Sequence, residues 1–94
     1  MSSSPRRAVV EHDARLDILC CLADGGPLAV EQVSGRTGMN PTQTRHHMQI
    51  LDAFGLVGKS REEGVGPTLY VARLNENPPW VIRAVNDHRR AAAK

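Results

Sequence analysis

The sequence predicts a mainly α-helical fold with one small β-hairpin, an α+β arrangement in a single domain. Three observations support this prediction. Apolar residues recur at helical spacing in four segments, the third segment has clear start and stop signals, and a β-prone stretch interrupted by Gly and Pro precedes the fourth. A chain of 94 residues can bury one modest core, so we expect one domain.

The first half of the chain predicts two helices of unequal length. One apolar stripe indicates a helix over residues 8–23, which ends at a Gly-Gly-Pro sequence. Residues 1–7 are rich in Ser and then basic, and we expect them to form a disordered N-terminal arm. After a short strand at residues 28–29, a second helix is predicted over residues 30–37, and Gly38 ends it.

The third helix has the clearest boundaries. Asn40 is a preferred N-cap residue, and Pro41 suits the first helical position. Gln43 stands where a capping box places Glu or Gln. We therefore predict a helix over residues 41–54, with Gly55 as its stop.

The third helix has one apolar face and one polar face. Met48, Leu51 and Phe54 share the face that is expected to anchor the helix on the core, and His47 lies beside this stripe. The remaining surface can donate and accept hydrogen bonds. It carries Thr42, Gln43, Arg45, His46 and Gln49.

The last third of the chain predicts a hairpin and a final helix. Two β-prone runs within residues 56–74 flank a loop that contains two glycines and a proline. A fourth helix is expected at about residues 79–91, within a C-terminal segment of residues 76–94 that we interpret as a dimerisation element. The apolar stripe of this helix, which we predict at the dimer interface, consists of Trp80, Val81, Ala84 and Val85.

Charge is distributed unevenly along the chain. The net charge of +2 is too small to indicate nucleic-acid binding by itself. Residues 11–31 carry five acidic residues against one basic residue, whereas residues 36–61 carry four basic residues against one acidic residue. We therefore expect one half of the fold to face an anion. Only three aromatic residues are present, which argues against a platform for stacking single-stranded bases.

The order of helix, short helix, turn, longer helix and hairpin is that of a winged helix-turn-helix, here over residues 8–75. Three stretches resemble ArsR-type winged-helix repressors in the same order. ARLDILCCL resembles the opening helix of that family, PLAVEQVSGRTG its second helix, and TRHHMQILDAFGLV its recognition helix up to the wing. The resemblance implies DNA-facing positions for Thr42, Gln43, Arg45 and His46, and a packing position for His47.

The predicted function is sequence-specific binding of double-stranded DNA by a transcriptional repressor that acts as a homodimer. The helix at residues 41–54 would occupy the major groove, with Gln43, Arg45, His46 and Gln49 as base-reading candidates. Thr42, Lys59 and Arg61 would contact phosphates or the minor groove, helped by Arg6 and Arg7 from the arm.

Two alternatives remain open at this point. In the first alternative, the chain is an adaptor that uses a winged helix for protein interaction without DNA. In the second, it is a metal- or redox-responsive repressor that uses Cys20 and Cys21. The metal-ligand patterns of ArsR-type sensors are absent, and adjacent His46 and His47 point about 100° apart on a helix, so no metal site and no cofactor are predicted.

Enzymatic and membrane functions are not expected. No nucleophile is paired with a base at credible spacing, and no phosphate-binding Gly-rich motif occurs. No apolar run approaches the length of a membrane span, and the first residues lack the apolar segment of a signal peptide. We therefore expect a cytoplasmic protein, with adjacent cysteines that stay reduced.

Overall fold

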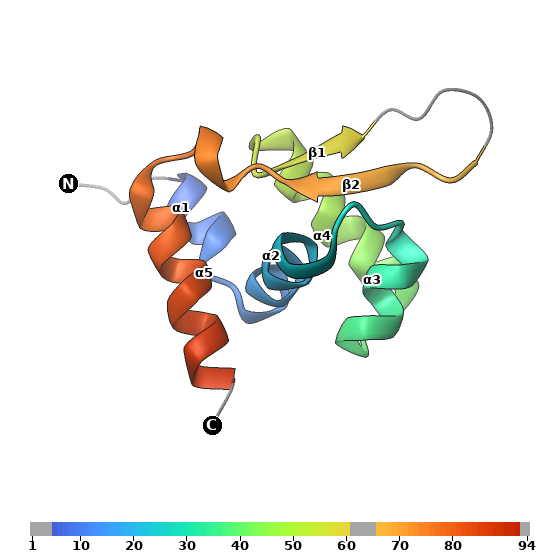
Figure 1. Ribbon diagram of the computed structural model, residues 1–94, viewed down its shortest axis with the longest axis horizontal. Helices are drawn as coiled ribbons and strands as arrows, with labels where there is room; N and C mark the ends of the chain where they lie inside the picture. Colours follow the sequence, from blue (N-terminus) through green and yellow to red (C-terminus); the bar gives the residue numbers. More distant parts are fainter. Residues whose placement is uncertain (1–4, 61–65, 93–94) are drawn as a thin grey trace.

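The computed structural model of the protein describes residues 5–60 and 66–92. It contains helices and one antiparallel hairpin, which confirms the predicted fold class (Figure 1). In chain order the elements are α1 (Pro5–Val10), α2 (Asp13–Gly25), α3 (Val30–Thr37), α4 (Pro41–Ala53), β1 (Val57–Ser60), β2 (Leu69–Ala72), the 3-10 turn η1 (Leu74–Glu76) and α5 (Pro79–Ala92).

The first predicted helix is in fact two helices. The chain leaves the helical conformation at His12, whose backbone is extended and whose Nδ1 accepts a hydrogen bond from the Ala14 N–H at 3.2 Å. This side chain caps the free N–H groups at the start of α2, so α1 and α2 meet at a corner. The prediction of an arm over residues 1–7 was wrong for residues 5–7, which belong to α1, whereas residues 1–4 lie outside the described residues.

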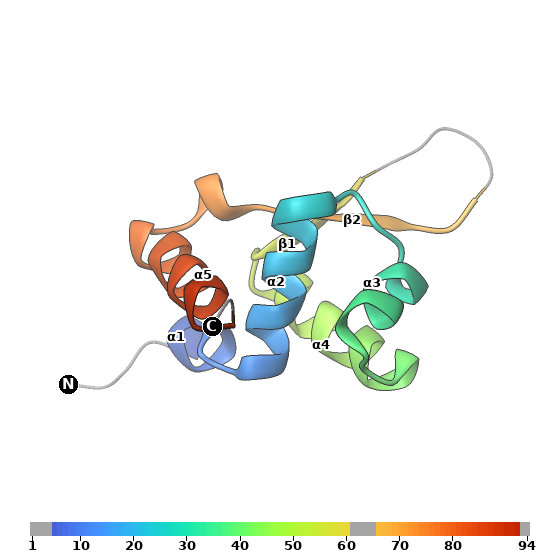
Figure 2. The ribbon, with the colours of Figure 1, turned by 60° about the horizontal axis from the view of Figure 1, so that its bottom comes forward.

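Helix α2 lies at the centre of the molecule. In both Figure 1 and Figure 2, α1 and α5 lie on one side of α2. Helices α3 and α4 lie on its other side, and the hairpin runs across one end. The side chains of Ile18 and Leu19 are fully buried, as are Met48 and Leu51 from α4. Burial of each such side chain contributes about 1.5–3 kcal/mol, so this shared core fixes α4 against α2.

The predicted start of α4 at Pro41 is confirmed, and the helix ends at Ala53, one residue before the predicted end. The Asn40 side chain accepts hydrogen bonds from the N–H groups of Thr42 and Gln43 at 2.7 and 3.4 Å, and Gly55 leaves the helix with φ of 74°. Within the described residues, the capping-box bond expected of Gln43 occurs instead at α3, where Gln32 Oε1 accepts from the Ala29 N–H at 2.9 Å. Asn40 therefore starts α4 without help from Gln43, whose side chain stays exposed.

The hairpin is joined to the helices by a third extended segment. Lys59 of β1 pairs with Tyr70 of β2. Tyr70 also exchanges two backbone hydrogen bonds with Leu28, at 3.0 and 2.8 Å, which places the predicted short strand as a single bridge beside β2. The linker between α2 and α3 thus holds the base of the hairpin in place.

Candidate nucleic-acid interface

The exposed face of α4 carries the polar side chains that the sequence indicated. Thr42, Gln43, Arg45, His46 and Gln49 are all exposed. On the opposite face, the Met48 and Leu51 side chains are fully buried. Thr44 is also fully buried, and its hydroxyl donates to the Asn40 carbonyl at 2.9 Å. The helix is therefore held rigidly on one side and presents donors and acceptors on the other.

Arg45 has an acidic partner on the neighbouring helix. Its Nη2 lies 3.6 Å from Oε2 of Glu31, in the first turn of α3, and both side chains are more than half exposed. The pair borders an open groove of about 270 Å³ between α3, α4 and the start of β2. In the sequence, Glu31 belongs to the acidic segment of residues 11–31, and the fold brings it against Arg45 of the basic segment of residues 36–61.

His47 packs beneath α4, at the junction with α1 and α2. Arg15 of α2 donates from Nε to His47 Nδ1 at 3.2 Å and from Nη1 to the Val9 carbonyl at 3.3 Å. The rings of His12 and His47 lie 5.1 Å apart, centroid to centroid. Partial burial lowers the pKa of His47, and the nearby Arg15 guanidinium lowers it further, followed by His12 and His46.

This environment predicts that acid destabilises the fold. Because the pKa of folded His47 lies below its unfolded value of 6.5, the unfolded chain binds a proton more readily. The contribution of neutral His47 is complete above that value and is lost as the pH falls through the lowered pKa. We expect the urea midpoint to fall between about pH 7.5 and about pH 5.5. His47→Gln should flatten this dependence more than His46→Gln, and equal effects of the two variants would contradict the assignment.

The hairpin presents Lys59 as an exposed cation on β1. Arg61, the other predicted cation of this strand, lies outside the described residues. Lys59 also borders an open pocket of about 550 Å³ at the base of the hairpin, where Arg6 and Arg73 meet Asp52 and Glu76. The surface beside the predicted wing therefore carries mixed charge.

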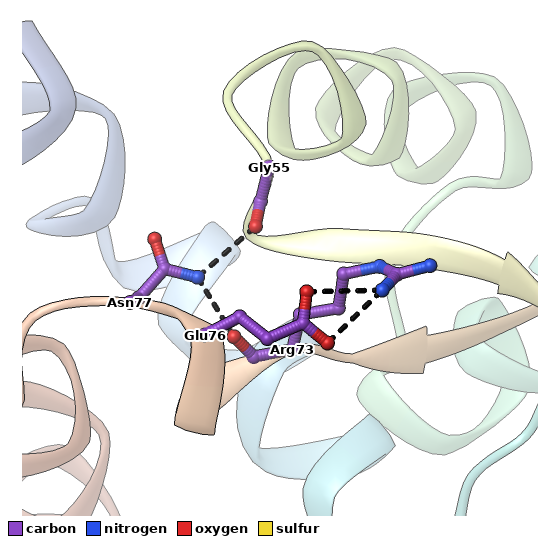
Figure 3. Close-up of polar contacts among 4 residues, drawn as sticks. All are labelled: Gly55, Arg73, Glu76 and Asn77. Atoms are coloured by element: carbon purple, nitrogen blue, oxygen red, sulfur yellow. Dashed lines mark hydrogen bonds and ion pairs between the residues drawn. The ribbon is translucent and has the colours of Figure 1, made fainter.

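A single amide ties the hairpin base to the end of α4. Figure 3 shows Asn77 Nδ2 donating to the carbonyl of Gly55 at 3.0 Å and to that of Arg73 at 2.7 Å. The Asn77 side-chain oxygen accepts a hydrogen bond from Arg6 of α1. Arg73 donates from Nη1 to both carboxylate oxygens of Glu76, at 3.1 and 3.0 Å. These contacts hold together α1, the α4–β1 turn and the end of β2.

Arg6 and Arg7 have contacts within the fold. Arg6 is bonded to Asn77, and Arg7 pairs with Glu11 at 3.1 Å while its guanidinium lies 5.0 Å from the ring centroid of Trp80. The expectation that both extend from a disordered arm toward DNA is corrected, because α1 is folded and packs against α2 and α4.

The predicted dimer stripe of α5 has two different environments. Val81 and Val85 are 0% exposed within the single chain, where α5 packs on α2. Because these side chains are covered within the single chain, we expect Val81 and Val85 to belong to the core of the protomer and not to a dimer interface. Trp80 and Ala84 are partly buried, and for these two the interface role remains a prediction.

The cysteines are both free and partly buried on α2. Cys20 lies with its Sγ 3.5 Å from the Val85 carbonyl oxygen, in the α2–α5 contact. Burial is the largest influence on both thiols and raises the pKa of each. Within the described part of the chain, no three His, Cys, Asp or Glu side chains gather as a set that could hold a metal ion.

Three residues that organise this surface were not predicted from the sequence. Arg15 supports His47 from below, Glu31 pairs with Arg45, and Asn77 joins the hairpin to α4. Each contact joins residues at least fourteen positions apart in the sequence, so local patterns do not reveal the pairing. Glu31 alone had a local signal, as an acid in the first turn of a predicted helix.

Comparison with known proteins decides the family. The bacterial regulatory protein family arsR matches residues 12–59, about half of the chain, from the start of α2 into β1. The protein belongs to the ArsR family. None of the curated proteins matches this ArsR-family chain.

Solved structures agree with this assignment. The ArsR-family chain is similar to the homodimeric winged helix-turn-helix DNA-binding domain of a possible ArsR-family regulator from Mycobacterium bovis, with a TM-score of 0.65 and 28% identity over 99% of this chain and 90% of that one. It is similar to the AntR antimony-specific transcriptional repressor, with a TM-score of 0.65 and 26% identity over 85% and 67%. A predicted DNA-binding regulator from E. coli shares the fold, with a TM-score of 0.71 and 20% identity over 89% and 82%.

Family and fold together identify a DNA-binding transcriptional regulator with a winged helix-turn-helix. They are those of regulators and not of enzymes. None of the helices within residues 5–60 and 66–92 is long and apolar enough to cross a membrane.

Proposed function

We propose that this ArsR-family protein is a repressor that binds a specific double-stranded DNA sequence as a homodimer. Helix α4 enters the major groove, and the β1–β2 hairpin contacts the backbone or the minor groove. The observation that carries the proposal is the polar face of α4, because five exposed donors and acceptors stand on a helix whose other face is buried. A helix of this kind fits the major groove and can distinguish base edges.

The side chains of this surface take two roles. Gln43, Arg45, His46 and Gln49 read base edges, for which an Arg fork or an amide provides paired donors and acceptors. Phosphate contacts fix the register of the complex and come from Thr42 beside the N-terminus of α4, from Lys59 and, on sequence grounds, from Arg61.

The partner copy packs on the outer side of α1 and α5. The related domain from Mycobacterium bovis is homodimeric. Trp80, with the Arg7 guanidinium over its ring, and Ala84 are the partly buried α5 residues that we assign to this contact. Two protomers double the contacts with DNA, which a small domain needs for useful affinity.

Lys59→Ala should weaken DNA binding without changing sequence preference. Because a phosphate contact is independent of sequence, affinity for all duplexes should fall, and the slope of log K against log salt should decrease by about 1 for each protomer, or about 2 for the dimer. Binding titrations at several salt concentrations measure both effects. Lys59→Arg keeps the charge and should keep the slope, and an unchanged slope in Lys59→Ala would remove this residue from the interface.

The proposed function is tested by selecting bound sequences from a pool of random duplexes with the purified protein. Enrichment of one motif is expected, and two inverted half-sites about 10 base pairs apart would reveal a symmetric dimer. If no motif is enriched and binding to random duplex shows no salt dependence, the adaptor alternative replaces DNA binding.

The metal- or redox-responsive alternative has less support. Thiolate is the form of cysteine that binds metals and reacts with oxidants, and the raised pKa of Cys20 and Cys21 disfavours it. A change in DNA affinity on addition of zinc or an oxidant would favour this alternative. We propose no cofactor and no catalytic role, and we expect the protein in the cytoplasm, where bacterial DNA lies.

A further inference from the structure

The pair between Arg45 and Glu31 joins the proposed base-reading helix to the helix before it. Arg45 lies in the middle of the polar face of α4, and Glu31 approaches it from the first turn of α3. Val30, beside Glu31, belongs to the core, so the backbone that carries the carboxylate is fixed. The carboxylate therefore stands at the surface that is proposed to meet DNA.

We infer that Glu31 is an intramolecular competitor of DNA: it holds Arg45 in the free protein and lowers the affinity for the duplex. This inference rests on the proposed function. To reach a base or a phosphate, the Arg45 guanidinium must leave the Glu31 carboxylate. The carboxylate then faces the negative charge of DNA without its partner, and both effects oppose binding.

The geometry of the pair suits an exchangeable contact. The 3.6 Å separation is longer than a normal hydrogen bond, and the side chains are 53% and 69% exposed. The Arg73–Glu76 pair differs, because its guanidinium makes two hydrogen bonds to one carboxylate. The single exposed contact between Arg45 and Glu31 is weak, so DNA can displace Glu31 from Arg45. The N-terminus of α3 stabilises the remaining negative charge of Glu31.

The inference is tested by a double-mutant cycle with Glu31→Gln and Arg45→Ala, using the duplex enriched from the random pool as the probe. Glu31→Gln should tighten binding by about two- to five-fold for each protomer of the dimer, the effect of removing one weak exposed ion pair. In the Arg45→Ala background, the same substitution should give a clearly smaller gain, because only the repulsion between the Glu31 carboxylate and DNA remains and no Arg45 guanidinium is held.

A charge-matched control separates this effect from general electrostatics. Asp24 pairs with Arg89 at 2.8 Å between the end of α2 and α5, so Asp24→Asn also removes one exposed negative charge and releases an arginine. It should leave DNA affinity within about 1.5-fold of the wild type. Thermal unfolding curves of all variants verify that each remains folded.

The outcomes distinguish this inference from the proposed function. If the wild type binds no duplex, the proposed function fails and the inference with it. If the wild type binds and Glu31→Gln equals Asp24→Asn, only the inference fails. An equal gain with and without Arg45 would also overturn it, because Glu31 would then act by repelling phosphates and not by holding Arg45.

Discussion

Arg45→Ala is expected to weaken binding of the selected duplex by about 1–3 kcal/mol for each protomer, the usual cost of losing a paired base contact. The side chain is exposed on the second turn of α4, and its loss leaves the buried face of the helix unchanged. The variant also leaves Glu31 without its cation at this surface, which adds repulsion toward DNA. Affinity for random duplex should fall less, so the ratio of specific to nonspecific binding should decrease.

Two further variants make this result interpretable. Arg45→Lys keeps the charge but loses the planar fork, so it should recover nonspecific affinity and leave the specific contact impaired. Arg36→Ala removes one exposed cation whose guanidinium lies beside Gly25 at the end of α2, and it should have little effect. Parallel titrations with selected and random duplexes measure the ratio. Unchanged specific affinity in Arg45→Ala would exclude this docking of α4.

Val85→Asp should unfold the protomer and not merely dissociate a dimer. Val85 is 0% exposed and packs between α5 and α2, so the variant places an unpaired carboxylate in the core. Leaving a buried charge without a partner costs about 3–5 kcal/mol, a large part of the stability of a small domain. Circular dichroism during urea titration should show loss of helix at every protein concentration.

Asn86→Asp is the matched control, because it places the same charge one residue further along α5 at an exposed position. Its urea midpoint should be close to that of the wild type. A folded but monomeric Val85→Asp variant, detected by sedimentation, would return Val85 to the dimer interface and contradict its position in the core.

The elements with strong local signals could be predicted from the sequence. Asn40 and Gly55 define α4 because capping is a property of neighbouring residues, and the boundaries in the structure agree with the prediction to within one residue. The break at His12 was missed because histidine is an uncommon N-cap and the apolar spacing of Val9 and Leu16 fits one continuous helix. The corner depends on a local hydrogen bond that hydrophobic periodicity does not register.

Contacts between distant segments could not be predicted. An apolar stripe such as that of α5 indicates which residues are covered, but not whether the cover comes from the same chain or from a second copy. Val81 and Val85 are covered within the chain, where α5 packs on α2, whereas Trp80 lies beside Arg7 of α1. Likewise, Glu31 and Arg45 are fourteen positions apart, and only the packing of α3 against α4 makes them neighbours.

The Asn77 amide affects the spacing of the two DNA half-sites that a dimer can bind. It joins the turn after α4 to the end of β2 and, through Arg6, to α1, so the helix and hairpin that are proposed to touch DNA cannot shift independently. Each protomer then meets DNA as one rigid unit. A dimer of two such units adapts to DNA only at the dimer interface, and this interface sets the spacing between the half-sites.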